Sequence, residues 1–385
     1  MVRCDVLIVG GGPAGSTCAR ELVAAGAEVI VLDRATFPRD KVCAGWITPS
    51  VVEALALDLD EYRAGNTLQP FTGFRTGPLE GRRRTTDFDH VVSYGIRRCE
   101  FDAYLLARAG VRVLSGEPLR ELRRDGDGWI ANDTVRAALV VGAGGHFCPV
   151  ARQLNRRDQD PSSRERVVVA QEIEFELDRQ ASSGCTVAGT RPELFFWPDL
   201  QGYGWCVRKG GYLNVGVGRL AQHDFPASVK QFADLVERLG LVPGGVPSPW
   251  KGHAYLVNRT SQRRIVDDGV LLVGDAAGLA LAPSGEGILA AIESGQAGAS
   301  VILGARGDYS NAVLARYDEW VERRMGPRGQ PGAFGHIPGW FTRLASRALF
   351  GSSWLTRRVL IEDGFLHTHR PPVDRAFIEP SRTAV

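Results

Sequence analysis

The sequence predicts an α/β (α+β) fold in which a mainly parallel sheet flanked by helices is interleaved with an antiparallel sheet and followed by a helical tail. Three observations predict it. Residues 4–33 are typical of strand, glycine turn, helix and second strand, and residues 167–251 alternate apolar and polar side chains between turns. Residues 306–385 carry helical spacing and are expected to form the helical C-terminal cap.

The first segment is a complete βαβ unit of the Rossmann type. Gly10, Gly12 and Gly15 have GxGxxG spacing directly after a β-branched run, and Pro13 and Ala14 complete the turn into an Ala/Leu helix. Gly10 permits the turn, Gly12 lets the backbone approach a pyrophosphate, and Gly15 lets the helix pack closely on the strand. The phosphates would then lie at the helix N-terminus.

The second strand of this unit ends in an acid. Asp33 stands where a carboxylate accepts hydrogen bonds from both hydroxyls of a ribose, and Arg34 follows it in the same predicted site. With its complete strand, turn and helix context, the segment predicts that a dinucleotide is bound here.

Turn-rich insertions separate the strands, so both domains are expected to be built from several segments. The predicted dinucleotide-binding domain comprises residues 1–70, 96–165 and 259–305, and the predicted antiparallel-sheet substrate domain comprises residues 71–95 and 166–258.

Composition limits the classes of partner. With 385 residues, 44% of them hydrophobic, the chain can form two cores, and its formal charge of +2 argues against a nucleic-acid partner. The seven cysteines form no CxxC pair, so neither a metal site nor a disulfide framework is expected. Without a signal peptide or a long apolar run, a cytoplasmic protein is expected, and the basic, apolar tail would allow peripheral contact with a membrane.

A second glycine motif distinguishes FAD from NAD as the cofactor. In residues 269–278, GVLLVGDAAG, Gly274 and Asp275 end a strand, and Gly285, Gly287 and Ile288 open the next helix. The acid can hold ribityl hydroxyls, while the positive end of the helix faces the flavin and stabilises its anionic reduced form. The sequence has no obvious attachment signature, so FAD is expected to be bound non-covalently.

With both motifs in place, the chain resembles the p-hydroxybenzoate hydroxylase class of FAD-dependent oxidoreductases and, within it, the geranylgeranyl reductase family. Residues 37–46, FPRDKVCAGW, are similar to the family's FPRxKxCGG, with Ala44 in place of a glycine. This resemblance implies that Arg39, Lys41 and Cys43 lie beside the flavin. Residues 97–106 match RxxFDxxL, which implies that Arg98 reaches FAD.

The resemblance extends to a pair of strands that would face the substrate. Residues 202–218 are similar to YxWxFPKxxxxNVGxG, retaining Tyr203, Trp205, Lys209, Asn214, Gly216 and Gly218. The catalytic set that it implies is Cys43, Tyr203 and Trp205. Structural roles remain open for these residues: Cys43 as an inert filler, Tyr203 and Trp205 as core.

Two of these assignments have structural alternatives, and one residue departs from the family pattern. Arg39 and Lys41 could form a solvated loop pair, and Arg98 a surface partner of Asp102. In the glycine loop before residue 288, Pro283 stands one place later than the family pattern has it.

One departure concerns the electron donor. Hydroxylases of this class carry GADGxxSxVR, whose aspartate helps manage pyridine-nucleotide binding, whereas residues 142–152 have Gly144 in its place and Cys148 in place of the serine. Apart from Cys148, His146 is the nearby titratable side chain. We therefore expect slow reduction by NAD(P)H, with a ferredoxin, a quinone or a flavin reductase as alternative electron-donor partners.

The predicted function is the reduction or dehydrogenation of an apolar, prenyl- or lipid-like small molecule by hydride transfer through flavin N5, with Cys43 or Tyr203 as proton donor. One alternative is an FAD-dependent monooxygenase acting on an aromatic or protein-bound substrate, as a hydroxylase or, less favoured without a WxWxIP segment, a halogenase. A non-catalytic flavin-binding electron carrier is the third, disfavoured because it has no need of the strand-rich residues 167–251.

Overall fold

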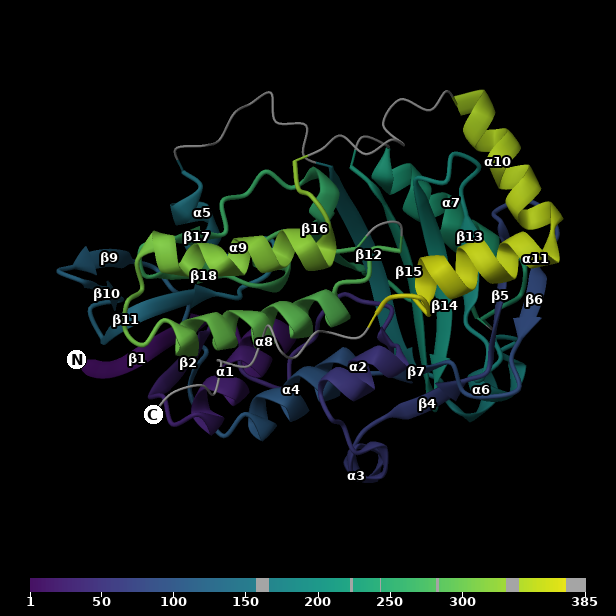
Figure 1. Cartoon of the computed structure of the whole chain (residues 1–385). Coiled ribbons are helices and arrows are strands. Elements are labelled where there is room, and N and C mark those ends of the chain that lie inside the picture. The colour runs from purple at the N-terminus through teal and green to yellow at the C-terminus, as the bar shows by residue number, and fades with distance from the viewer. Residues whose placement is uncertain (157–165, 222–223, 243, 282–283, 330–338, 372–385) are drawn as a thin grey trace.

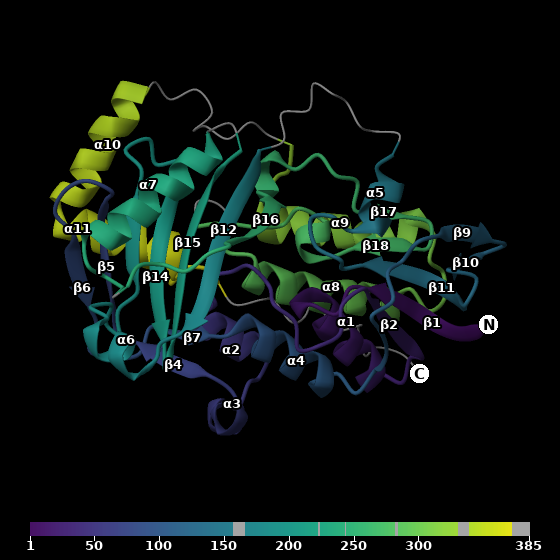
Figure 2. The same ribbon diagram turned by 180° about the vertical axis from the view of Figure 1, so that it is seen from behind.

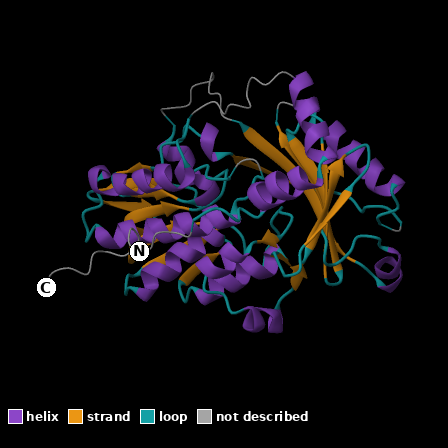
Figure 3. Cartoon of the chain, turned by 45° about the vertical axis from the view of Figure 1, so that its right-hand side comes forward, coloured by secondary structure: helices purple, strands orange, loops and turns teal. Residues whose placement is uncertain are grey.

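The computed structural model describes residues 1–156, 166–221, 224–242, 244–281, 284–329 and 339–371. Pro283 and two stretches of the predicted tail, 330–338 and 372–385, lie outside the described residues. Two large sheets lie side by side, each with helices packed against it (Figure 1, Figure 3). This arrangement confirms the predicted fold class.

The strands are β1 (Val2–Val9), β2 (Val29–Asp33), β3 (Trp46–Ile47), β4 (Leu68–Phe71), β5 (Gly73–Pro78), β6 (Arg84–Asp87), β7 (Ser93–Ile96), β8 (Arg112–Ser115), β9 (Leu122–Asp125), β10 (Gly128–Ala131), β11 (Val135–Gly142), β12 (Val167–Glu176), β13 (Glu193–Phe196), β14 (Gly202–Lys209), β15 (Tyr212–Leu220), β16 (Lys251–Leu256), β17 (Val266–Asp267) and β18 (Val270–Leu272).

The helices are α1 (Pro13–Ala24), α2 (Pro49–Ala54), α3 (Leu59–Gly65), α4 (Arg98–Arg108), α5 (Pro149–Leu154), α6 (Arg179–Gly184), α7 (Phe225–Arg238), α8 (Ile288–Gly304), α9 (Asn311–Met325), α10 (Gly339–Gly351) and α11 (Ser353–Leu355). Two 3₁₀ turns, η1 (Asn258–Thr260) and η2 (Gly274–Ala276), and one π-helical segment, η4 (Thr356–Phe365), complete the described elements.

The first sheet is the Rossmann core. Its order is β17-β18-β11-β1-β2-β8, with β10 and β9 added beside β11, and the central pairs β18/β11, β11/β1, β1/β2 and β2/β8 are parallel. The apolar residues of β1 and β2 are buried because helices cover the sheet, α1 among them. The predicted βαβ unit therefore lies at the centre of this sheet.

The second sheet has the order β16-β12-β15-β14-β13-β5-β6 and is antiparallel except for the parallel pair β13/β5. Helix α7 lies across one face (Figure 2). Alternation along β14 sends Cys206 into the cluster under α7 and Trp205 into the cluster that packs on the C-terminal cap. The exact segment boundaries drawn from the sequence stay a prediction.

A small third sheet, β3-β7-β4, and the C-terminal cap complete the architecture. Phe350, Leu360, Ile361 and Phe365 of the cap belong to the apolar cluster that contains Trp205 of the second sheet. In the part of the chain that the structure describes, no helix is long and apolar enough to span a membrane.

Candidate active site

A cavity of about 700 Å³ lies where the two large sheets meet. Most residues predicted for the site line it, and these are Gly10, Gly12, Pro13, Ala14, Asp33, Arg34, Arg39, Lys41, Cys43, Arg98, Tyr203, Trp205, Asp275, Gly285, Gly287 and Ile288. Two predicted residues, Gly15 and Gly274, do not line the cavity. A Cβ at Gly15 would lie 1.9 Å from the Gly10 oxygen, and one at Gly274 would lie 3.0 Å from the Ala14 Cβ, so both permit close packing behind the wall.

The glycine turn before α1 forms a cradle for an anion. Gly10 has φ +116°, and a Cβ there would lie 2.4 Å from the Ala143 oxygen, so a side chain is excluded. Arg39 Nη2 lies 3.4 Å from the position of a Cβ at Gly12, the N-cap of α1. An arginine beside the positive end of a helix dipole favours an anion at this turn, and a pyrophosphate would provide one.

Asp33 holds the shape of this cradle. Its carboxylate accepts hydrogen bonds from the Gly11 amide at 2.7 Å and the Ala35 amide at 2.8 Å. Asp33 is 8% exposed, at the cavity wall, where its remaining lone pairs can accept ribose hydroxyls. Arg34 beside it is exposed.

Arg98 and Arg39 share one buried acid. Arg98 donates two hydrogen bonds to Asp102, at 2.9 and 3.0 Å, and Arg39 lies 3.1 Å from the same carboxylate. Arg98 is buried at the cavity, so the alternative that it is a surface partner of Asp102 is wrong. Burial opposes its charge, but Asp102 and the Cys43 thiol more than offset that effect and raise the pKa of Arg98.

Lys41 and Asp275 face each other across the cavity from different segments. Burial lowers the pKa of Lys41 to about 8, although Asp275 opposes the shift. Burial also disfavours the charged form of Asp275, but His253, with Nε2 3.5 Å from its Oδ2, and Lys41 keep its pKa below the ordinary value. Lys41 is therefore not a solvated loop residue, and the pair places polar groups opposite the middle of the cavity.

The start of α8 is brought to the same cavity by close helix packing. A Cβ at Gly295 of α8 would lie 2.5 Å from the Ala14 oxygen of α1, so both helix N-termini reach one wall. Gly285 has φ +74°, and a Cβ there would lie 2.1 Å from the Tyr255 hydroxyl. Gly287 caps α8 with a Cβ position 3.3 Å from Asp275 Oδ1. This backbone can approach a flat ring system closely.

The opposite end of the cavity is aromatic. The Phe365 ring from η4 lies 5.5 Å from the Trp46 ring and 5.3 Å from the Tyr203 ring, and Tyr203 lies 5.8 Å from Trp205. We call Trp46, Tyr203, Trp205 and Phe365 the aromatic wall. The Tyr203 hydroxyl donates to the Ser284 oxygen at 2.7 Å, and burial raises its pKa well above the ordinary value.

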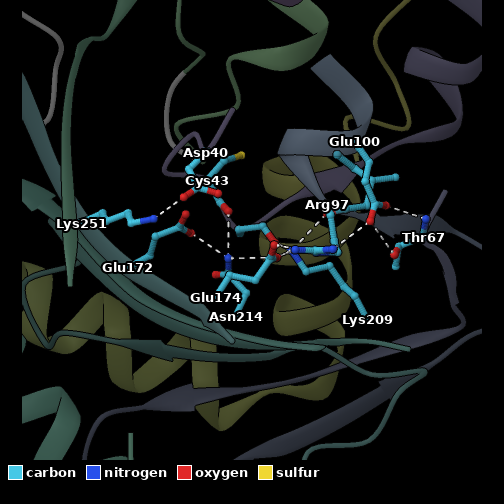
Figure 4. A network of polar contacts seen from close by, with 12 residues as sticks. Asp40, Cys43, Thr67, Arg97, Glu100, Glu172, Glu174, Lys209, Asn214 and Lys251 are labelled. Atoms are coloured by element: carbon cyan, nitrogen blue, oxygen red, sulfur yellow. Dashed lines mark hydrogen bonds and ion pairs between the residues drawn. The ribbon is translucent and has the colours of Figure 1, made fainter. Parts of the chain in front are cut away.

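Cys43 lies on a loop that the second sheet holds in place (Figure 4). Lys209, whose side chain has no exposed surface, donates to the Ala44 oxygen at 3.1 Å and the Ile96 oxygen at 3.0 Å and pairs with Glu174 at 2.5 Å. Asn214 donates to the Cys43 oxygen at 3.2 Å. The thiol therefore lies at the cavity on a backbone that is held at the carbonyl oxygens of Cys43 and Ala44.

Beneath this loop, Trp205, Asn214 and Glu172 form a chain of hydrogen bonds. Trp205 Nε1 donates to Asn214 Oδ1 at 2.7 Å, and Asn214 donates to Glu172 Oε2 at 2.8 Å. Burial raises the pKa of Glu172 to about 7, although Lys209 and Asn214 oppose the shift. The side chain of Trp205 is therefore both part of the aromatic wall and a support for the loop.

Gly144 stands where hydroxylases of this class carry an aspartate, and the structure leaves little room for a side chain there. A Cβ at Gly144 would lie 3.3 Å from both the Cα and the sulfur of Cys148, so an aspartate would crowd that buried cysteine. His146 lines the cavity, and burial together with Arg263 lowers its pKa to about 4. The described residues contain no cluster of His, Cys, Asp or Glu suited to a metal ion.

Four residues of the site were not identified from the sequence: His253, Tyr255, Glu172 and Phe365. His253 and Tyr255 alternate on β16, and Glu172 occupies the same cavity-facing register of β12 as Ala170. That alternation was the available signal for these three. Phe365 carries no signal, since only the packing of the cap brings it to the cavity.

Comparison with known proteins agrees with this geometry. Residues 3–325 match the family model described as an FAD binding domain. The chain belongs to this family of FAD-binding proteins, and it is an FAD-dependent oxidoreductase whose cofactor is FAD.

The relatives confirm the resemblance to geranylgeranyl reductases. A menaquinone reductase of Mycolicibacterium smegmatis is 29% identical over 335 residues, covering 80% of this chain and 79% of the relative. Digeranylgeranylglycerophospholipid reductase 3 of Methanosphaera stadtmanae is 26% identical over 346 residues, covering 84% of each.

Solved structures share the fold. A geranylgeranyl bacteriochlorophyll reductase-like protein from Thermoplasma acidophilum has a TM-score of 0.70 at 23% identity, covering 98% of this chain and 95% of that one. A probable FAD-dependent monooxygenase from Pseudomonas aeruginosa has a TM-score of 0.62 at 21% identity, covering 91% of this chain and all of the other.

Proposed function

We propose that this protein reduces a carbon–carbon double bond, or catalyses the reverse dehydrogenation, in an apolar molecule of prenyl or lipid type. The observation that carries the proposal is the position of the Cys43 thiol, on a clamped loop at the cavity that the aromatic wall encloses. The names of the menaquinone and digeranylgeranylglycerophospholipid reductases support the same substrate class.

The cradle, Asp33 and the start of α8 would hold FAD in the cavity that Cys43 also lines. Bound FAD, reduced by an external electron donor, supplies the hydride through N5. The aromatic wall excludes water from the reacting carbons and offers flat apolar surfaces to a prenyl chain.

Reduction of an alkene needs a proton as well as a hydride, because the carbon next to the one that takes the hydride becomes electron-rich. Of the two candidates, Tyr203 already donates its hydroxyl hydrogen to the Ser284 oxygen, and its raised pKa makes it a weaker acid. Cys43 lines the cavity, and no hydrogen bond donated by its sulfur is found among the described residues. This contrast favours Cys43 as the proton donor, with Tyr203 closing the wall.

A substitution tests this role. Cys43→Ser should retain FAD and its visible spectrum while lowering turnover of a prenyl quinone or prenyl lipid by about 100-fold or more, the usual scale for a positioned acid. Cys99→Ser, at a half-buried cysteine outside the cavity, is the matched control and should keep full turnover. Full turnover by Cys43→Ser with normal flavin content would make Cys43 a packing residue.

A monooxygenase is the second candidate, and the shared fold of the Pseudomonas aeruginosa monooxygenase is the observation that favours it. The two functions differ in their response to oxygen. In stopped-flow experiments with dithionite-reduced protein, the reductase should transfer electrons to an alkene substrate anaerobically. An oxygenated product that forms only on mixing with O₂ would establish the monooxygenase instead.

A further inference from the structure

Helix α10 exposes large apolar side chains and buries small hydroxyl side chains. Thr342, Ser346 and Phe350 are buried, whereas Trp340, Phe341 and Leu344 are 68%, 47% and 56% exposed. A helix in water normally turns its large apolar side chains toward the core. Here small hydroxyl side chains take most of that face, and the aromatic residues are left outside.

Large apolar residues are also exposed in the part of the cap that follows α10. Trp354 and Val359 are 67% and 46% exposed, and we call these two residues together with Trp340, Phe341 and Leu344 the cap patch. Of the ten large apolar residues exposed in the described part of the chain, five belong to this patch. Clustering of this kind marks a binding surface rather than scattered exposure.

The charges within residues 339–361 have one sign. Residues 339–361 contain Arg343, Arg347, Arg357 and Arg358 and no acidic residue. Glu362 pairs with Arg357 and Arg358, at 2.9 Å each, which leaves Arg343 and Arg347 as exposed cations without an ion pair in the described residues. The partner that fits is apolar and negatively charged at its surface.

We propose that the cap patch binds the surface of a bilayer containing anionic lipids. Tryptophan and leucine side chains enter the boundary between headgroups and acyl chains, and arginine side chains reach the phosphates from the same depth. A second copy of this chain fits less well, because a symmetric contact through this face would bring the arginines of both copies together.

The patch stands at the outer edge of the molecule, where α10 runs beside β5 and β6 (Figure 1). Arg84 of β6 fixes its C-terminal end by donating to the Phe350 and Gly351 oxygens, both at 2.7 Å. The same segment continues through η4 to Phe365, which lines the cavity. Membrane binding would therefore set one wall of the substrate cavity next to the phase in which a lipid substrate dissolves.

Vesicle sedimentation of the full-length, FAD-loaded protein tests the proposal, and it does not require the proposed reaction. The probes are phosphatidylcholine vesicles with and without phosphatidylglycerol. Binding should need phosphatidylglycerol and weaken as salt rises. Trp340→Ser/Phe341→Ser/Leu344→Ser should weaken it by roughly 100-fold, and Arg343→Gln/Arg347→Gln by about tenfold.

Matched control variants distinguish a loss of vesicle binding from a loss of folding. Leu239→Ser, at a residue 39% exposed on the C-cap of α7, and Arg112→Gln, at an exposed residue of β8, should bind as the unchanged protein does. FAD content reports the fold of each variant. Absence of binding to either vesicle, equal binding to both, or unchanged binding by the triple variant would overturn the proposal. So would a dimer that the triple variant abolishes without any vesicle binding.

Discussion

Lys209→Met tests whether the buried clamp under the Cys43 loop stabilises the protein. The methionine keeps the apolar stem but removes three contacts: those to the Ala44 and Ile96 oxygens, at 3.1 and 3.0 Å, and that to Glu174 at 2.5 Å. Each unmatched buried carbonyl costs about 1–2 kcal/mol, and Glu174 keeps Arg97 as its other cation, so the free energy of unfolding should fall by about 3–5 kcal/mol.

The assay is urea unfolding followed by tryptophan fluorescence, with alkylation of Cys43 by iodoacetamide read by mass spectrometry. The loosened loop should make Cys43 react faster. Lys251→Met is the matched control, since its ion pair with Asp40 is 63% and 68% exposed and should cost at most about 1 kcal/mol. Equal stability and equal alkylation rates for the two single variants would refute the reasoning.

Three further predictions follow from the site. The pKa of Glu172 lies at about 7 in the folded protein, above its ordinary 4.5. Its contribution to the free energy of unfolding is therefore complete below about pH 4.5 and is lost as pH rises through 7. Glu172→Gln should remove this loss, worth roughly 3 kcal/mol by pH 8, and urea midpoints with the same pH dependence in both proteins would contradict it. Asp33→Ala should weaken FAD binding about 10- to 100-fold in a fluorescence titration, whereas Asp58→Ala, which removes a similar backbone acceptor at α3, should not; equal affinities would remove Asp33 from the site. With Gly144 in place of an aspartate, NADPH alone should bleach the flavin more slowly than about one per second, and faster bleaching in a stopped-flow mixing experiment would reject that expectation.

The sequence could predict that several glycines and an acid meet at one end of the cavity, because these residues are local to one unit. Gly10, Gly12 and Asp33 lie within one βαβ unit, where strand, turn and helix geometry alone bring them together. The charges at Arg39, Lys41 and Arg98 were identified only through a family resemblance. Their joint relation to Asp102 and Asp275 needed the fold, since these residues come from separate segments.

The sequence by itself determined the Rossmann unit, the second sheet and FAD as the cofactor, because each follows from periodicity or from glycine positions that repeat along a short stretch. Only the tertiary structure decided which residues line the cavity together. Phe365 stacks on Trp46, and Lys209 donates a hydrogen bond to the Ala44 oxygen. Each pair is separated by more than 150 residues of chain, and the second pair by 165. Those contacts depend on how the cap and the second sheet pack against the first, and side-chain spacing along the chain carries no record of that packing. The structure likewise shows which side of α10 is exposed, because Thr342 and Ser346 are buried while Trp340 and Leu344 are exposed.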